Sequence, residues 1–100
     1  EDEPVDRTEL EFGAKNYPNP ANPGTSIKYT LPDEGHVNIS IINIMGHTVM
    51  ELENSYKQAG KHTVLWDGRN RTGNIAATGL YFYRINYKDQ VLVNKFLLIK

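Results

Sequence analysis

The chain has 100 residues, of which 39% are hydrophobic and 23% charged, a composition that fits one folded domain rather than a disordered segment. Its formal net charge of −1 argues against nucleic-acid binding, which needs a basic excess, and no apolar run approaches the roughly 20 residues that span a membrane. Cysteine is absent, which excludes disulfide bonds and thiolate zinc sites.

The chain opens with an acidic head that lacks the hydrophobic periodicity of a strand or helix. Residues 1–12 hold six acidic side chains and Arg7, a net charge of −5, whereas residues 13–100 carry +4. The head begins with neither an initiator Met nor a signal peptide, as expected for a piece of a longer protein. We expect residues 1–14 to be an acidic linker and residues 15–100 to be the folded domain.

A proline-rich strip follows the head. Pro18, Pro20 and Pro23 each fix φ, remove a backbone donor and disfavour the helical region for the preceding residue. The strip is therefore expected to be an ordered turn or an extended segment, and it is excluded from the centre of a sheet. We expect Tyr17 to pack on the edge of the fold and pin the strip.

Short strand-like runs separated by turn signals fill the rest of the chain. Alternation places Ile27, Tyr29 and Leu31 on one face of the first run, and β-branched and aromatic residues dominate throughout. The expected strands are residues 26–31, 36–44, 48–53, 62–67, 78–87 and 90–99, joined by turns or loops at 32–35, 45–47, 54–61, 67–74 and 88–89. Gly46 is the expected positive-φ residue of its turn. We predict an all-β fold, an Ig-like antiparallel β-sandwich of about seven short strands.

Catalytic constellations are not evident. Histidines occur only at turns or strand starts, as His36, His47 and His62, and no Gly-x-Ser-x-Gly elbow is present. The neighbouring carboxylates Asp33 and Glu34 lie in a turn, where acidic residues are common for reasons of turn geometry. We expect no catalytic residues and no cofactor.

The polar loop after the tryptophan offers the closest approach to a metal site. Asp67, Asn70 and Asn74 carry oxygens of the kind that bind Ca²⁺, but Arg69 and Arg71 occupy positions where a calcium loop places further acids. The preferred interpretation is a loop closed by Asx hydrogen bonds, with no metal.

Four aromatic side chains lie close together near the end of the chain. Tyr81, Tyr83 and Tyr87 share one face of the expected strand, whereas Phe82 takes the other. A sugar-stacking platform would explain the row, but a sandwich core explains it more simply.

The last strand is apolar and ends in residues 95–100, with Lys95 and Lys100 at its limits. A strand at this position is expected to lie on a sheet edge, and exposed edges invite strand addition. The two lysines either keep that edge soluble or are read by a receptor, and sequence physics leaves both readings open.

Together these segments resemble the type A C-terminal sorting domain of the type IX secretion system, over about residues 15–100. The resemblance rests on six pieces in register: the opening Tyr17-Pro18-Asn19-Pro20, the strand at 25–32, the hairpin at 42–49, the segment Trp66-Asp67-Gly68, the segment Gly79-Leu80-Tyr81, and the terminal strand with Lys95, Phe96 and Lys100. The Trp-Asp-Gly and Gly-x-Tyr pieces are also similar to the Ig-like domain of flagellar hook-capping proteins. At Ala21 the family frequently has an aromatic residue, and we expect Tyr17 to supply the anchoring contact instead.

The resemblance implies a secretion signal for an N-terminal cargo domain in a Gram-negative bacterium. Cargo of this kind passes through the periplasm and the outer-membrane translocon, and a cell-surface sortase then cuts before the domain, here within residues 1–14. Translocon and sortase would be its partners, and the cell surface or the medium its destination. The recognition residues carried over by position are Gly79, Tyr81, Lys95, Phe96 and Lys100.

Two other functions remain open at this point. A carbohydrate-binding or spacer module of an extracellular enzyme predicts an exposed aromatic row, and a hook-capping-like assembly module predicts a defined oligomer. We expect the chain not to be an enzyme.

Overall fold

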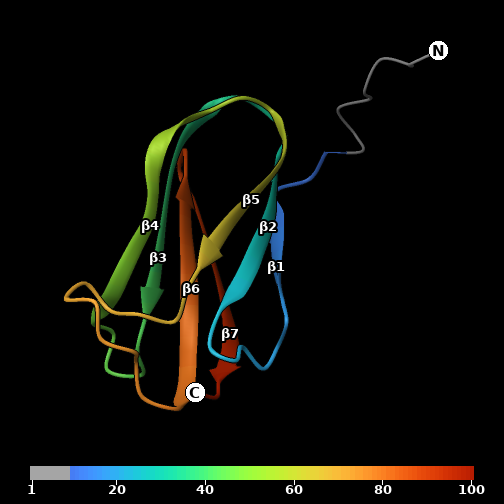
Figure 1. Ribbon diagram of the computed structural model, residues 1–100. Coiled ribbons are helices and arrows are strands. Elements are labelled where there is room, and N and C mark those ends of the chain that lie inside the picture. Colours follow the sequence, from blue (N-terminus) through green and yellow to red (C-terminus); the bar gives the residue numbers. More distant parts are fainter. Residues whose placement is uncertain (1–9) are drawn as a thin grey trace.

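The computed structural model describes residues 10–100, which form a two-layer β-sandwich with no helix in that range (Figure 1). A three-stranded sheet has the order β1-β2-β5 and a four-stranded sheet the order β4-β3-β6-β7, with every pair of strands antiparallel. The strands are β1 (Gly13–Tyr17), β2 (Thr25–Leu31), β3 (Gly35–Ile42), β4 (Thr48–Lys57), β5 (Gly60–Trp66), β6 (Gly79–Tyr87) and β7 (Gln90–Leu98). The predicted Ig-like sandwich is confirmed.

The core follows from alternation along the strands. In β2 the residues Ile27, Tyr29 and Leu31 are buried and point away from the solvent-facing Lys28, as predicted. The inner faces of β3 and β6 contribute buried side chains in the same way: Val37, Ile39, Ile41, Tyr81, Tyr83, Ile85 and Tyr87. Because three of the four neighbouring aromatics face inward, the row in β6 is core and not an exposed platform.

The predicted loop at 54–61 is wrong. The strand β4 continues to Lys57, and only two residues separate it from Gly60, where β5 begins. The polar residues at the end of β4 suggested a loop, yet they pair with β3, for example Ser55 with Val37 and Tyr56 with His36. This short link carries the chain from one sheet to the other, and β5 crosses from the end of β4 to lie beside β2 (Figure 1).

The turn between β3 and β4 begins earlier than predicted. The strand ends at Ile42, and Ile44 is 69% exposed. The side-chain oxygen of Asn43 accepts hydrogen bonds from the backbone N–H groups of Met45 and His47. Gly46 has φ 85°, as its position predicted.

The acidic head was predicted to end at residue 14, and residues 1–9 lie outside the described part of the chain. The strand β1 begins at Gly13, so residues 13 and 14 pair with β2. Just before the strand, the ring of Phe12 packs against that of Tyr87, with centroids 5.0 Å apart. The entering chain therefore contacts the core at the end of β6.

Candidate recognition surface

The proline-rich strip is held by backbone hydrogen bonds along the edge of β7. Ala21 donates its N–H to the Leu97 carbonyl and accepts from the Ile99 N–H, both at 2.8 Å. Nearby, the side-chain oxygen of Asn19 accepts from the Leu97 N–H at 3.3 Å. The strip thus adds a short parallel pairing to the last residues of the strand.

The predicted anchoring role of Tyr17 is wrong, because its side chain is 78% exposed. Alternation along β1 places Tyr17 on the outward face of the strand, together with Lys15. Ala21 is fully buried and takes the anchoring position. Its small side chain allows the backbone of the strip to approach β7 closely enough for hydrogen bonds.

The Trp-Asp-Gly segment closes the loop that follows it. The indole N–H of Trp66 donates to the Arg69 carbonyl at 2.9 Å, and the carboxylate of Asp67 accepts from the Arg69 N–H at 3.0 Å. Trp66 is only 2% exposed, so the first bond satisfies a donor that would otherwise be buried without a partner.

The same segment contacts the proline-rich strip, although the two are distant in sequence. Gly68 has φ 86°, and a Cβ there would lie 2.6 Å from the Cβ of Pro23. On the other side of the contact, a Cβ at Gly24 would lie 3.0 Å from the Trp66 carbonyl oxygen. The two glycines allow two backbones to meet closely, which explains why both motifs belong to one structural unit.

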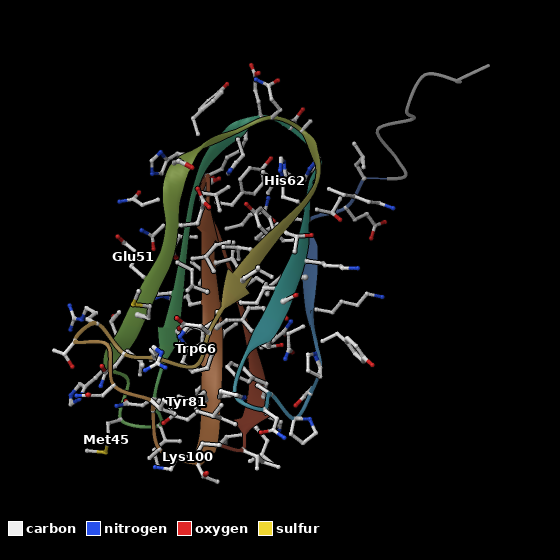
Figure 2. All side chains as sticks on the ribbon, viewed as in Figure 1. Met45, Glu51, His62, Trp66, Tyr81 and Lys100 are labelled. Atoms are coloured by element: carbon white, nitrogen blue, oxygen red, sulfur yellow. The ribbon has the colours of Figure 1, made fainter. Side chains whose placement is uncertain are left out.

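An aromatic cluster joins the two sheets beneath this contact. The ring of Trp66, from β5, lies 6.0 Å from that of Tyr81 and 5.8 Å from that of Phe96, between centroids. The Tyr83 ring adds a contact to Phe96 at 6.2 Å. Figure 2 shows Trp66 and Tyr81 in the same half of the molecule as Lys100.

Four of the five predicted recognition residues lie on the adjacent strands β6 and β7, and Lys100 follows the end of β7. The five differ in accessibility. Tyr81 and Phe96 pair across β6 and β7, and their side chains are buried in the aromatic cluster. Lys95 is exposed and pairs with Phe82, on the outer face of the sheet. Gly79 pairs with Leu98, and next to it the Lys100 N–H donates to the Thr78 hydroxyl at 3.2 Å. In the folded domain, only the two lysines of this set present side chains to a partner.

Sequence reasoning missed the outer face that surrounds Lys95. The exposed fractions of Val91, Val93, Leu97 and Leu80 are 63%, 51%, 41% and 42%. Arg84 lies opposite Val93 in this face, and its buried Nε has no hydrogen-bond partner among the described residues. Alternation in residues 90–99 signals this stripe, since every second residue points away from the core.

A family model described as a secretion system C-terminal sorting domain matches residues 15–100. The chain belongs to this family. The predicted resemblance is therefore confirmed, and no curated protein matches the sequence. Sorting domains of the type IX system are generally non-catalytic signals for export of an N-terminal cargo to the cell surface or the medium in Gram-negative Bacteroidetes.

Two solved structures of type IX components from Porphyromonas gingivalis share the fold of the sorting domain. The first is from a study of PorZ, with 21% identity and a TM-score of 0.63, and its match covers 88% of this chain and 12% of that one. The second is dimeric latent PorU, with 16% identity and a TM-score of 0.69, covering 86% of this chain and 9% of that one. The sorting domain thus spans about a tenth of either protein, and at these identities the likeness shows the fold alone.

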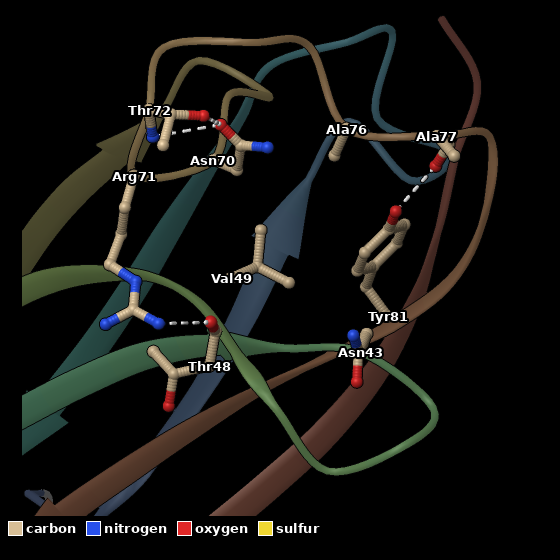
Figure 3. Close-up of a pocket in the computed structure, with 9 residues that line it drawn as sticks. All are labelled: Asn43, Thr48, Val49, Asn70, Arg71, Thr72, Ala76, Ala77 and Tyr81. Carbon is tan, nitrogen blue, oxygen red and sulfur yellow. Dashed lines mark hydrogen bonds between the residues drawn. The ribbon is translucent and has the colours of Figure 1, made fainter.

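The structure of the sorting domain contains a cavity of about 380 Å³ beneath the loop after Gly68 (Figure 3). Its polar groups hold the loop in place: the Tyr81 hydroxyl donates to the Ala77 carbonyl at 2.7 Å, and the Arg71 guanidinium donates to the Thr48 carbonyl at 3.4 Å. The lining residues are Asn43, Thr48, Val49, Asn70, Arg71, Thr72, Ala76, Ala77 and Tyr81. Both donors are engaged by backbone carbonyls of the chain itself, so these hydrogen bonds hold the loop over the cavity.

Two of the side-chain oxygens that suggested calcium, those of Asp67 and Asn70, accept hydrogen bonds from backbone N–H groups. Asn70 accepts from the N–H groups of Thr72 and Asn74 at 3.1 Å each and from the Thr72 hydroxyl at 2.8 Å. This is the Asx arrangement expected from the sequence. Within residues 10–100, no group of three or more His, Asp or Glu side chains is placed to hold a metal ion. The same range contains no helix long and apolar enough to cross a membrane.

Burial raises the pKa of two core tyrosines of the sorting domain, Tyr29 and Tyr83. It raises the pKa of Tyr29 to about 12, with a smaller contribution from the charge of Glu53. Burial also raises the pKa of Tyr83, although a hydrogen bond from Asn94 to its hydroxyl at 2.8 Å opposes the shift. These phenols therefore remain neutral and act as core side chains.

Proposed function

We propose that this sorting domain directs an attached N-terminal cargo from the periplasm through the outer-membrane translocon of the type IX system. The observation that supports the proposal, beyond family membership, is the separation of the two ends of the domain. Phe12 enters beside Tyr87, the last residue of β6, whereas Lys100 is bonded to Thr78, just before the first residue of that strand. Nine residues of β6 span about 30 Å. A cargo attached at one end therefore leaves the other end open to the translocon.

A cell-surface sortase then cuts within residues 1–14 and releases the cargo from the domain. Proteases need an extended chain that is free of sheet pairing. Support comes from residues 10 and 11, which precede both the docked Phe12 and the first strand, and from the exposed side chain of Glu11. Cleavage here would separate the cargo and leave the sandwich intact.

Carbohydrate binding receives no comparable support from the geometry. Sugar stacking needs exposed aromatic faces, and Tyr81, Tyr83 and Tyr87 are at most 7% exposed. Tyr17 and Tyr56 are exposed, but they belong to β1 and β4, strands of different sheets.

The test is an export assay in a host with type IX secretion. A fluorescent protein with a signal peptide is fused to residues 1–100, and the matched control carries residues 1–14 only. We expect the full fusion at the cell surface or in the medium, and the control in the periplasm. Periplasmic retention of both fusions would contradict the proposal. Surface delivery of an uncleaved full-length fusion would contradict the sortase step alone.

A further inference from the structure

The four edges of the two sheets are protected to different degrees. Natural sheets protect their edges with short strands, irregular register and charged residues. The edge strand β1 has five residues, and β4 has two register irregularities and carries Glu51, Glu53 and Lys57. The other two edge strands each contact the opposite sheet, β5 through β4 and β7 through β1. Of these two, β7 is the longer strand: it pairs in unbroken register over nine residues and contains one charged residue, Lys95.

Backbone groups along the first half of β7 face away from the sheet. Leu97 and Ile99 bond the strip on the side opposite β6, so the odd-numbered residues of the strand direct both N–H and C=O outward. The strip covers only residues 97–99. At Val91, Val93 and Lys95 the outward N–H and C=O groups have no partner within residues 10–100. These three residues form an acceptor edge for another strand.

Side chains beside this edge define the chemistry of an added strand. Val91 and Val93 are exposed and apolar, so they favour aliphatic neighbours. Across β6 and β7, the outward residues include the cations Arg84 and Lys95 and no acidic residue. The buried Nε of Arg84 also lacks a hydrogen-bond acceptor among the described residues. A carboxylate next to Val93 would pair with the guanidinium charge of Arg84.

Charge also distinguishes between two occupants of this edge, a second copy of the chain and a strand from a different protein. Pairing β7 with β7 of a second copy would place two Arg84 and two Lys95 side chains beside the shared edge, where β6 and β7 carry no acidic side chain on that face. Like charges placed together across strands are destabilising. A partner strand that carries an acidic residue removes this cost.

We propose that residues 91–95 of β7 accept an extended strand from the export-machinery protein that reads the sorting domain. The added strand carries aliphatic side chains beside Val91 and Val93 and a carboxylate beside Arg84. This inference rests on the proposed function and specifies how recognition occurs. The proposed contact lies in the open first half of β7 and not at residues 97–99, which the proline-rich strip covers.

The test uses three substitutions at one exposed position in the fusion to residues 1–100. Val93→Pro removes the outward N–H, Val93→Glu sets a carboxylate against the carboxylate of the added strand, and Val93→Thr keeps both the N–H and the β-branched shape. Pro is tolerated where an edge N–H faces solvent, so folding should persist, and chemical denaturation of the isolated chain checks it. We expect surface delivery to fall about tenfold for Val93→Pro, since one lost bond and one unmet carbonyl cost about a factor of ten. We expect a similar fall for Val93→Glu, because like charges face each other across the strands, and a change within about twofold for Val93→Thr.

Each outcome bears on the proposal. Normal export of folded Val93→Pro or of Val93→Glu would overturn it, as would equal loss in Val93→Thr. If Val93→Pro fails to fold, Val93→Glu and Val93→Thr decide. A wild-type dimer in sedimentation that folded Val93→Pro dissociates without loss of export would assign the edge to a second copy and overturn the proposal. Failure of the wild-type fusion to leave the periplasm would instead refute the proposed function itself.

Discussion

The indole ring of Trp66 meets the ring of Phe96 edge-on, with centroids 5.8 Å apart and planes at 80°. Trp66 ends β5 in one sheet, and Phe96 lies in β7 of the other, so the pair links both layers. Its indole N–H also fixes the loop that contacts the proline-rich strip. One buried side chain therefore couples the core, the loop and the edge of β7.

Truncation of this side chain should unfold the domain. Trp66→Ala removes a large aromatic from a buried site and is expected to lower the free energy of unfolding by about 3–5 kcal/mol. The control is Leu65→Ala at the neighbouring position, which is 70% exposed and should change that free energy by under about 0.5 kcal/mol. Urea denaturation of residues 1–100 measures both, and equal midpoints for the two variants would refute the central role of Trp66.

Contact between the two glycine-containing segments can be isolated with a matched pair of substitutions. Gly68 and Gly73 have similar positive φ values of 86° and 91°, so alanine costs each about 1–2 kcal/mol in backbone strain. Only at Gly68 does the new methyl group meet Pro23, whereas nothing lies within 4 Å of it at Gly73. We expect Gly68→Ala to be less stable than Gly73→Ala by about 1–3 kcal/mol, the cost of overpacking. If urea denaturation gives equal losses of unfolding free energy for the two variants, the proline-rich strip shifts to accommodate the methyl group without cost.

Local patterns predicted the sandwich because burial alternates along β2, along most of β6 and along the first half of β3. Ile27, Tyr29 and Leu31 occupy the face that the sequence assigned to them, and the same holds for Val37 in β3. The end of β4 was missed because its polar residues pair as an edge strand, where burial is partial and alternation is weak. Tyr17 was misplaced because an aromatic ring suggests burial, whereas its parity in β1 exposes it.

The candidate recognition surface was only partly predictable. The exposure of Lys95 and the edge position of β7 followed from the apolar terminal strand, and both are found. The covering of residues 97–99 by Ala21 is a contact between distant segments, for which no local pattern exists. Arg84 was not singled out because its significance depends on its cross-strand neighbour Val93 and on a buried Nε.

Alkaline pH should destabilise the domain through Tyr29. Its folded pKa of about 12 exceeds the value of 10.0 expected for an unfolded tyrosine, because burial favours the neutral phenol. Stability from this group is complete below pH 10.0 and is lost as pH rises toward 12, by about 2–3 kcal/mol in total. Tyr29→Phe keeps the ring and removes the ionisation, so its free energy of unfolding should fall less over this range. If the unfolding free energies of the wild type and Tyr29→Phe, measured in urea titrations, fall in parallel as pH rises, Tyr29 is not the source of the lost stability.

Replacement of the two terminal lysines should separate recognition from folding. Lys95 and Lys100 are exposed, so the double variant Lys95→Ala/Lys100→Ala should lose under about 0.5 kcal/mol of stability per site. The control Lys28→Ala/Lys61→Ala makes the same change in net charge, with exposed lysines of the other sheet. We expect the terminal variant to remain in the periplasm and the control to reach the cell surface, measured by protease accessibility of the fused cargo. Normal export of both would show that the lysines serve only solubility, and equal loss in both would point to net charge rather than position.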